Sequence, residues 1–180
     1  NDVMITQTFK ILLLEDLHTD QVLLKRQINK FIPNAIFTIA NSKDSFLERI
    51  NWSRYDLILS DYNLPDYNGL EALLVSKEKM PQVPFVFVTG TLNDEEKVAQ
   101  AVLRGASGYV LKDNLKEIEE RLNPIIQQSL QNTEDNRTAA DQKAKKERLE
   151  QKLEAKIYAL PNSEHKEELV GIVKEMNQLK

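Results

Sequence analysis

An apolar run meets two carboxylates in the stretch Ile11-Leu12-Leu13-Leu14-Glu15-Asp16. A second run of the same kind, Leu57-Ile58-Leu59-Ser60, leads directly into Asp61. Continuous apolar runs of this length are typical of strands that are buried on both faces of a parallel sheet. Because the carboxyl ends of parallel strands meet at one edge of the sheet, we expect Glu15, Asp16 and Asp61 to lie close together.

Two further strand-like runs end in polar residues that suit the same edge. The run at residues 85–88 ends at Thr89, and the run at residues 108–111 ends at Lys112. If all four runs belong to one parallel sheet, the carboxylates, the hydroxyl and the ammonium group meet at one place. Such a set of groups indicates a site for a divalent cation and a phosphoryl group.

Strand-like and helix-like segments alternate along the first part of the chain, which is typical of an α/β fold with a doubly wound sheet. Ser42 is a good N-cap for the second helix, and Asn93 or Asp94 is one for the fourth. The strands are expected at residues 10–14, 35–40, 57–60, 85–88 and 108–111. The helices are expected at residues 19–31, 42–50, 69–79 and 94–104, and from 115 to about 130.

The composition of the chain changes after Gln131. Residues 132–160 contain no glycine or proline and are rich in alanine, lysine, glutamate and glutamine, which predicts an exposed helix that continues to about residue 160. Pro161 breaks this helix, and a second amphipathic helix is expected at about 163–179. We therefore divide the chain into an N-terminal tail (1–8), an α/β domain (9–131) and a helical extension (132–180).

The helical extension carries an apolar stripe with the spacing of a short coiled coil. The stripe consists of Leu149, Leu153, Ile157 and Leu160, and Lys146 interrupts it on the N-terminal side. Two amphipathic helices joined by a short turn cannot bury both of their stripes alone, so we expect a partner surface, for which a second copy of the chain is one candidate. The chain begins with Asn1 rather than methionine, so an output region lost by truncation is an open alternative.

The overall composition argues against several classes of function. The sequence is 41% hydrophobic and 29% charged, with a formal net charge of -4 and no cysteine, so disulfides and thiolate metal sites are excluded. No apolar run approaches the roughly 20 residues that cross a bilayer, so we expect no membrane partner and a cytoplasmic location. Nucleic-acid binding is not expected either, because 14 basic and 18 acidic residues precede the boundary at Gln131 and 10 of each follow it.

Asp61 is the best candidate for a nucleophile, because it stands alone at the end of a central strand. A carboxylate that attacks a phosphoryl donor forms an acyl phosphate. Mg2+ prefers several oxygen ligands, and clustered carboxylates need a cation and Lys112 nearby if all of them are to stay charged. The hydroxyl of Thr89 is expected to donate a hydrogen bond to a phosphoryl oxygen.

These residues, together with Tyr109, resemble the receiver domain of two-component response regulators. The resemblance covers about residues 9–131 and implies a flavodoxin-like (βα)5 fold whose sheet has the strand order 2-1-3-4-5. It implies that a histidine kinase or a phosphotransfer protein phosphorylates Asp61. It also implies that Thr89 and Tyr109 move together on phosphorylation, although ordinary core packing is an alternative explanation for Tyr109.

The same resemblance implies a set of ligands for Mg2+. They are Asp16, Asp61 and the backbone carbonyl of Asn63, with Glu15 acting through a water molecule. Such a domain is not an enzyme with turnover, although Mg2+-dependent self-phosphorylation and slow self-dephosphorylation are expected. A phosphatase with an aspartyl nucleophile usually needs a second aspartate where this chain has Asn63, so that alternative is disfavoured. A pseudo-receiver that is not phosphorylated and acts as a docking scaffold is the remaining alternative.

Two features depart from the usual pattern of the family. Lys112 is followed by Asp113 rather than by proline, so we expect a trans peptide bond there. The extension has no helix-turn-helix pattern and no excess of basic residues, which argues against control of transcription by this chain alone. We expect the signal to pass into the extension, and a homodimer through its helices and through the face of the fourth and fifth helices is one outcome.

Overall fold

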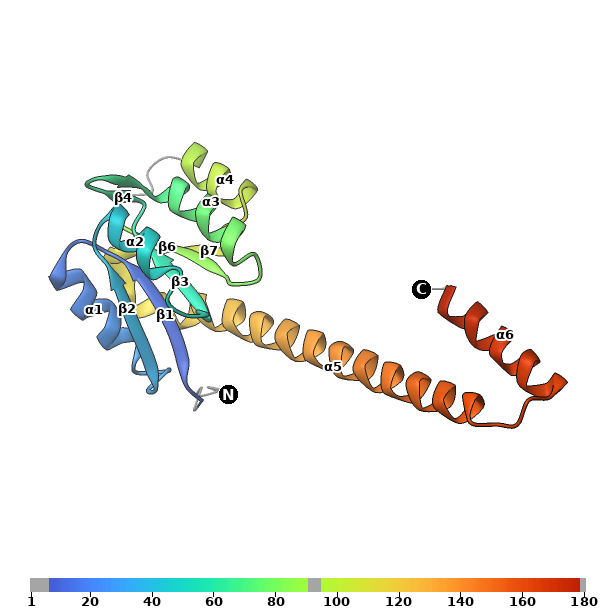
Figure 1. Cartoon of the computed structure of the whole chain (residues 1–180). Coiled ribbons are helices and arrows are strands. Elements are labelled where there is room, and N and C mark those ends of the chain that lie inside the picture. The colour runs from blue at the N-terminus through green and yellow to red at the C-terminus, as the bar shows by residue number, and fades with distance from the viewer. Residues whose placement is uncertain (1–6, 91–94, 179–180) are drawn as a thin grey trace. The chain divides into compact units, whose positions relative to one another are not determined.

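The computed structural model describes residues 7–90 and 95–178. Its main sheet has five parallel strands in the order β2-β1-β3-β6-β7. Numbered by themselves, these strands follow the order 2-1-3-4-5, so the predicted flavodoxin-like fold is confirmed (Figure 1). The strands are β1 (Phe9–Leu14), β2 (Ala35–Ala40), β3 (Leu57–Ser60), β6 (Phe85–Thr89) and β7 (Gly108–Leu111).

Helices cover both faces of this sheet (Figure 1). On one face, α1 (His18–Ile28) and the first turns of α5 (Ile118–Tyr158) pack against Ile11 and Leu13. On the other face, Leu12 and Leu14 lie in a cluster with α2 (Lys43–Arg49), α3 (Gly69–Lys79) and α4 (Glu95–Leu103). Successive side chains of a strand point to opposite faces, so β1 must be apolar at consecutive positions to serve both clusters.

The predicted strands agree with the observed strands to within one residue at each end. The N-cap predicted at Ser42 is confirmed, because its side chain accepts a hydrogen bond from the backbone N–H of Ser45 in a capping box. The cap predicted at Asn93 or Asp94 lies outside the described residues. The first helix ends at Ile28, three residues before its predicted end, because the chain then tightens into turns that bury Phe31 and Ile32 in the core.

The bounds expected for the fifth helix, residue 115 to about 130, differ from those observed. Lys112–Glu117 form a 3-10 turn, and α5 then continues without a break to Tyr158. The change in composition at Gln131 marks the loss of burial rather than an end of the helix, since no glycine or proline interrupts residues 125–160. Pro124 lies inside α5, where it removes one backbone donor without ending the helix.

The chain divides into two compact units, residues 1–130 and 131–180. In the second unit, α6 (Glu164–Gln178) folds back on the end of α5, where Ile157 is buried and Asn177 Nδ2 donates a 2.8 Å hydrogen bond to Glu154. Lys166 Nζ donates to the carbonyl oxygens of Tyr158 and Leu160, which leaves fewer unpaired acceptors at the end of α5. Across residues 7–90 and 95–178, no helix has both the length and the apolar content that crossing a bilayer requires.

Candidate functional site

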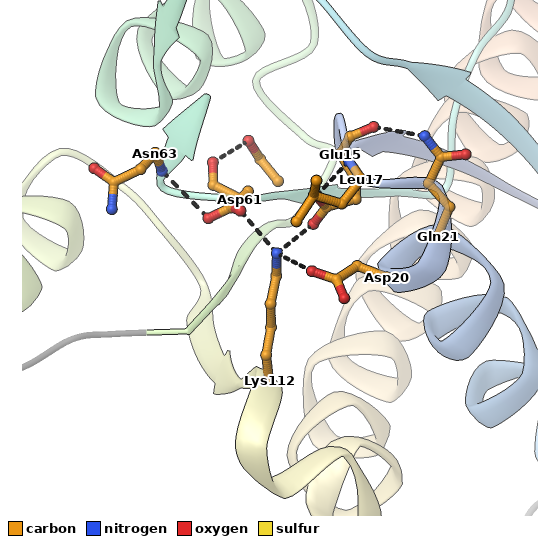
Figure 2. Close-up of polar contacts among 8 residues, drawn as sticks. Glu15, Leu17, Asp20, Gln21, Asp61, Asn63 and Lys112 are labelled. Carbon is orange, nitrogen blue, oxygen red and sulfur yellow. Dashed lines mark hydrogen bonds and ion pairs between the residues drawn. The ribbon is translucent and has the colours of Figure 1, made fainter. Parts of the chain in front are cut away.

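Four of the five parallel strands bring a polar group to the same edge of the sheet. Glu15 and Asp16 follow β1, and Asp61 follows β3. Thr89 is the last residue of β6 and pairs in register with Leu111, which precedes Lys112. The expected meeting of carboxylates and ammonium is therefore present (Figure 2).

The ammonium group of Lys112 lies among three carboxylates. Its Nζ atom is 2.6 Å from Glu15 Oε2, 2.7 Å from Asp20 Oδ2 and 2.8 Å from Asp61 Oδ2. Burial alone would lower the pKa of Lys112, but the contacts with Asp20, Asp61 and Glu15 outweigh burial and raise the pKa above its ordinary value. Lys112 thus remains charged and neutralises part of the acidic cluster.

Glu15 is the most deeply placed acid of the site, with 0% of its surface exposed. Burial raises the pKa of Glu15, although the hydrogen bond with Lys112 and the N–H of Leu17 act in the opposite direction. The N–H of Leu17 donates a 3.1 Å hydrogen bond to Glu15 Oε1, and Gln21 Nε2 donates a 2.8 Å bond to the backbone carbonyl of Glu15. These two bonds fix Glu15 relative to the start of α1 (Figure 2).

Asp61 is held at its backbone and at its side chain. Its N–H donates to the carbonyl of Leu14 at 2.9 Å, which ties the end of β3 to the end of β1. Its Oδ1 accepts a 3.2 Å hydrogen bond from the backbone N–H of Asn63, while its Oδ2 faces Lys112. Asn63 therefore contacts Asp61 through its amide, and the part predicted for its carbonyl as a metal ligand stays a prediction.

A short hairpin and a glycine shape the loop after Asp61. The hairpin consists of β4 (Asn63–Leu64) and β5 (Tyr67–Asn68) and was not predicted. Gly69 follows it, and a Cβ atom there would lie only 2.8 Å from the carbonyl oxygens of Asp61 and Tyr62 and from the Phe87 ring. Glycine at this position lets the start of α3 approach the backbone of Asp61.

Three of the acids could hold a metal ion together. Carboxylate oxygens of Glu15, Asp16 and Asp61 all lie within 4.8 Å of one another. Several carboxylate oxygens around one point are the donors that a hard divalent cation such as Mg2+ prefers. The residues present therefore fit such an ion.

The predicted switch residues occupy the two strands next to this site. Thr89 is buried at the end of β6, and Tyr109 is half-buried on β7, opposite Phe87 in the strand pairing. The guanidinium of Arg121, on α5, lies 5.1 Å from the centre of the Tyr109 ring. The peptide bond after Lys112 is trans as predicted, since the described residues contain no cis peptide bond.

Two residues that contribute to this arrangement, Asp20 and Gln21, were not predicted from the sequence. Both lie at the start of α1, and the only signal for Asp20 was an acidic residue in the first turn of a helix that begins beside the site. Such a residue is usually explained by the helix dipole alone. Its contact with Lys112, 92 positions away in the sequence, required the fold.

Comparisons with known proteins agree with this geometry. Residues 11–123 match the family described as the response regulator receiver domain. The transcriptional regulatory protein CrdR of Helicobacter pylori is 31% identical over 118 residues, which cover 63% of this chain and 53% of that protein. This chain thus spans about half the length of CrdR, and its matches to other curated relatives cover smaller shares of them.

Solved structures show the same fold. A CheY-like response regulator receiver domain protein from Methanospirillum hungatei has a TM-score of 0.63 and 22% identity, with 70% of this chain and 99% of that chain covered. The Mn(2+)-bound form of response regulator Rcp1 has a TM-score of 0.54 and 25% identity, with 62% and 90% covered. The family match extends over nearly all of the sheet and over Glu15, Asp61 and Lys112, so the chain belongs to the family of response regulator receiver domains.

Proposed function

We propose that this receiver domain accepts a phosphoryl group on Asp61 from a histidine kinase or a phosphotransfer protein. The observation that carries the proposal is the 2.8 Å contact between Lys112 Nζ and Asp61 Oδ2 inside an acidic cluster. A lysine in this place reduces the repulsion between a negatively charged donor and the Asp61 carboxylate.

The chemistry is a transfer of one phosphoryl group. A carboxylate oxygen of Asp61 forms a bond to phosphorus, the bond between phosphorus and the donor breaks, and the leaving group keeps the electron pair. Lys112 supplies positive charge beside the new phosphoryl oxygens, and the Thr89 hydroxyl is proposed to donate a hydrogen bond to one of them.

Mg2+ is the proposed cofactor. Asp16, Asp61 and the backbone carbonyl of Asn63 would hold it, with Glu15 acting through water, and it would neutralise charge on the phosphoryl oxygens. Two observations support a divalent cation, namely the spacing of Glu15, Asp16 and Asp61 and the Mn(2+)-bound state of the related Rcp1 structure. Asn63 offers no carboxylate for acid or base catalysis, so we propose slow self-dephosphorylation rather than enzymatic turnover.

The signal is proposed to pass through Thr89 and Tyr109 into α5. Tyr109 contacts Arg121 near the start of α5, and α5 is one helix from Ile118 to Tyr158. A change in the position of the Tyr109 ring would alter the packing of this helix where it begins. Receiver and extension share α5, so the helix is a physical connection between them.

A homodimer is the proposed output, with no part for nucleic acid. Val102 and Leu103 of α4 and Leu111 of β7 are exposed apolar side chains within the receiver unit. The extension unit exposes a second apolar set, made up of Leu149, Leu153, Leu169, Ile172 and Met176. Exposed apolar side chains in sets of this kind are typical of surfaces that bind another protein.

Intact mass measurement tests the acceptor. The purified chain is incubated with Mg2+ and acetyl phosphate beside the variants Asp61→Asn and Asp66→Asn. Asp66 is a nearby carboxylate that accepts a hydrogen bond from the backbone of Lys43, so it controls for the loss of a local charge. We expect one phosphoryl group on the parent chain and on Asp66→Asn, and none on Asp61→Asn or in the presence of EDTA.

A parent chain that is folded and receives no phosphoryl group would contradict the proposal. Absence of Mg2+ binding in the same sample would then favour a docking scaffold. A phosphoryl group that persists on Asp61→Asn would place the acceptor at another residue.

A further inference from the structure

Lys112 has one carboxylate partner that belongs to neither the metal cluster nor the acceptor. Asp20 Oδ2 accepts a 2.7 Å hydrogen bond from Lys112 Nζ. Among the described residues, the carboxylates that cluster closely enough to hold a cation are those of Glu15, Asp16 and Asp61. The structure therefore gives Asp20 a contact with Lys112 without giving it a place among the candidate metal ligands.

We propose that Asp20 is a positioning residue that holds the ammonium group of Lys112 beside Asp61 for phosphoryl transfer. This inference rests on the function proposed above. Asp20 would act through Lys112 and would touch neither the phosphoryl group nor the metal ion.

Lys112 has as many carboxylate partners as it has donors. An ammonium group has three N–H donors, and in the resting site Lys112 has three carboxylates within 2.8 Å. Phosphorylation turns Asp61 into an acyl phosphate, and Glu15 is proposed to contact a bound cation through a water molecule. Of the three partners, Asp20 is the one with no other proposed role at the site, so its carboxylate remains available to Lys112.

Asp20 also has a fixed place in the fold. It lies in the first turn of α1, and the next residue, Gln21, is buried and donates a 2.8 Å hydrogen bond to the backbone carbonyl of Glu15. This bond joins the start of α1 to the end of β1. Lysine has a long and flexible side chain, so a fixed carboxylate limits the positions that its ammonium group can take.

Competition for Lys112 is the opposite possibility. If Asp20 drew the ammonium group away from the phosphoryl group, its removal would accelerate phosphorylation. The geometry favours positioning, since Lys112 contacts Asp20 and Asp61 at nearly the same distance and does not have to leave one to reach the other.

The experiment compares Asp20→Ala with a matched variant, Asp44→Ala. Asp44 is an exposed acid in the first turn of α2, so its removal also deletes an N-terminal helix charge but lies outside the site. Phosphorylation by acetyl phosphate is followed by intact mass over a range of donor and Mg2+ concentrations. We expect the maximal rate of Asp20→Ala to fall by roughly 10- to 100-fold, the upper figure being the cost of a misplacement of about 1 Å. Its half-saturating Mg2+ concentration and the rate of Asp44→Ala should stay at the parent values.

A second readout reports on Lys112 itself. In chains labelled with 13C-lysine, the ε-methylene signal of Lys112 is assigned by its loss in Lys112→Met. We expect the chemical shift of this signal in the parent chain to differ from the shifts of surface lysines. In Asp20→Ala, we expect the chemical shift to move towards the values of surface lysines and the signal to become narrower. Asp20→Asn, which keeps the shape of the side chain, serves as the second variant if Asp20→Ala does not fold.

Three results would overturn the inference. They are an equal or faster maximal rate without the Asp20 carboxylate, an unchanged Lys112 signal, or a shifted half-saturating Mg2+ concentration that would make Asp20 a metal ligand. A parent chain that is never phosphorylated would instead refute the proposed function, so the two failures can be told apart.

Discussion

The guanidinium of Arg121 lies 5.1 Å from the centre of the Tyr109 ring, and so connects α5 with the strand that leads to Lys112. Arg121 also lies 3.6 Å from Glu117, one turn earlier in the chain. Both side chains of this second pair are more than 40% exposed, so the pair contributes little to stability. The contact with the half-buried Tyr109 ring is the better candidate for a structural connection.

Replacement of Tyr109 by alanine should separate phosphorylation from the behaviour of the extension. Tyr109→Ala should still accept a phosphoryl group, because Asp61 and Lys112 are intact, but a phosphorylation-dependent change in oligomeric state should be lost. Tyr109→Phe keeps the ring and should keep the change. Sedimentation analysis with and without acetyl phosphate makes the comparison, and unchanged coupling in Tyr109→Ala would refute the relay through this ring.

Replacement of Lys112 by methionine should destabilise the metal-free domain. Glu15, Asp20 and Asp61 would lose their shared counter-charge, and Glu15 has no exposed surface through which water could compensate. We expect a loss of about 3 kcal/mol, the size found when one partner of a buried charge pair is removed. Urea unfolding in EDTA measures the loss in the free energy of unfolding, and Lys116→Met on the 3-10 turn is the control. Equal stability of Lys112→Met and the parent chain would contradict this prediction.

Replacement of Glu15 by glutamine should have the opposite effect on the metal-free domain at neutral pH. Folding raises the pKa of Glu15 above its ordinary value of 4.5, so the folded domain binds the proton of the Glu15 carboxyl more tightly than the unfolded chain does. The folded domain therefore loses stability as the pH rises above 4.5. Glu15→Gln cannot ionise and avoids this loss. Its advantage over the parent should shrink as the pH falls to about 4, where the unfolded glutamate also becomes protonated.

Urea unfolding in EDTA at several pH values measures the difference in the free energy of unfolding between Glu15→Gln and the parent, and so tests its sign. The prediction fails if Glu15→Gln is less stable than the parent at neutral pH. It fails as well if the difference between the two grows towards acid pH.

Replacement of Gly69 by alanine should distort the loop that carries Asp61. The new Cβ would meet two backbone oxygens and the Phe87 ring at 2.8 Å, so we expect a loss of about 2 kcal/mol, as for other overpacked positions. Gly171, on α6, has open space where a Cβ atom would lie, and Gly171→Ala should gain up to about 1 kcal/mol from helix propensity. Thermal unfolding of Gly69→Ala and Gly171→Ala measures both changes in stability. Equal changes in stability in the two variants would contradict the steric explanation.

The strands could be predicted because their apolar runs have to satisfy two core clusters at once, as Leu12 and Leu13 do on opposite faces. Their order in the sheet came from the resemblance, not from the apolar pattern. The places of Glu15, Asp16, Asp61 and Lys112 followed from the same reasoning, since each residue lies within two positions of the end of a strand. Asp20 could not be predicted, because it approaches Lys112 from a helix whose position over the sheet is a tertiary property. The end expected for the fifth helix near residue 130 was misplaced for a different reason, since a change from buried to exposed side chains resembles the end of a helix although the backbone continues.

Negative charge exceeds positive charge around Lys112. Glu15, Asp16, Asp20 and Asp61 place four carboxylates around one ammonium group, which leaves a formal charge of -3 at the sheet edge. Inorganic phosphate and other small anions are repelled from this edge when no divalent cation is bound. If a divalent cation binds at this edge as proposed, it would reduce the formal charge from -3 to -1, so the local supply of divalent cations would set when an anionic donor can approach Asp61.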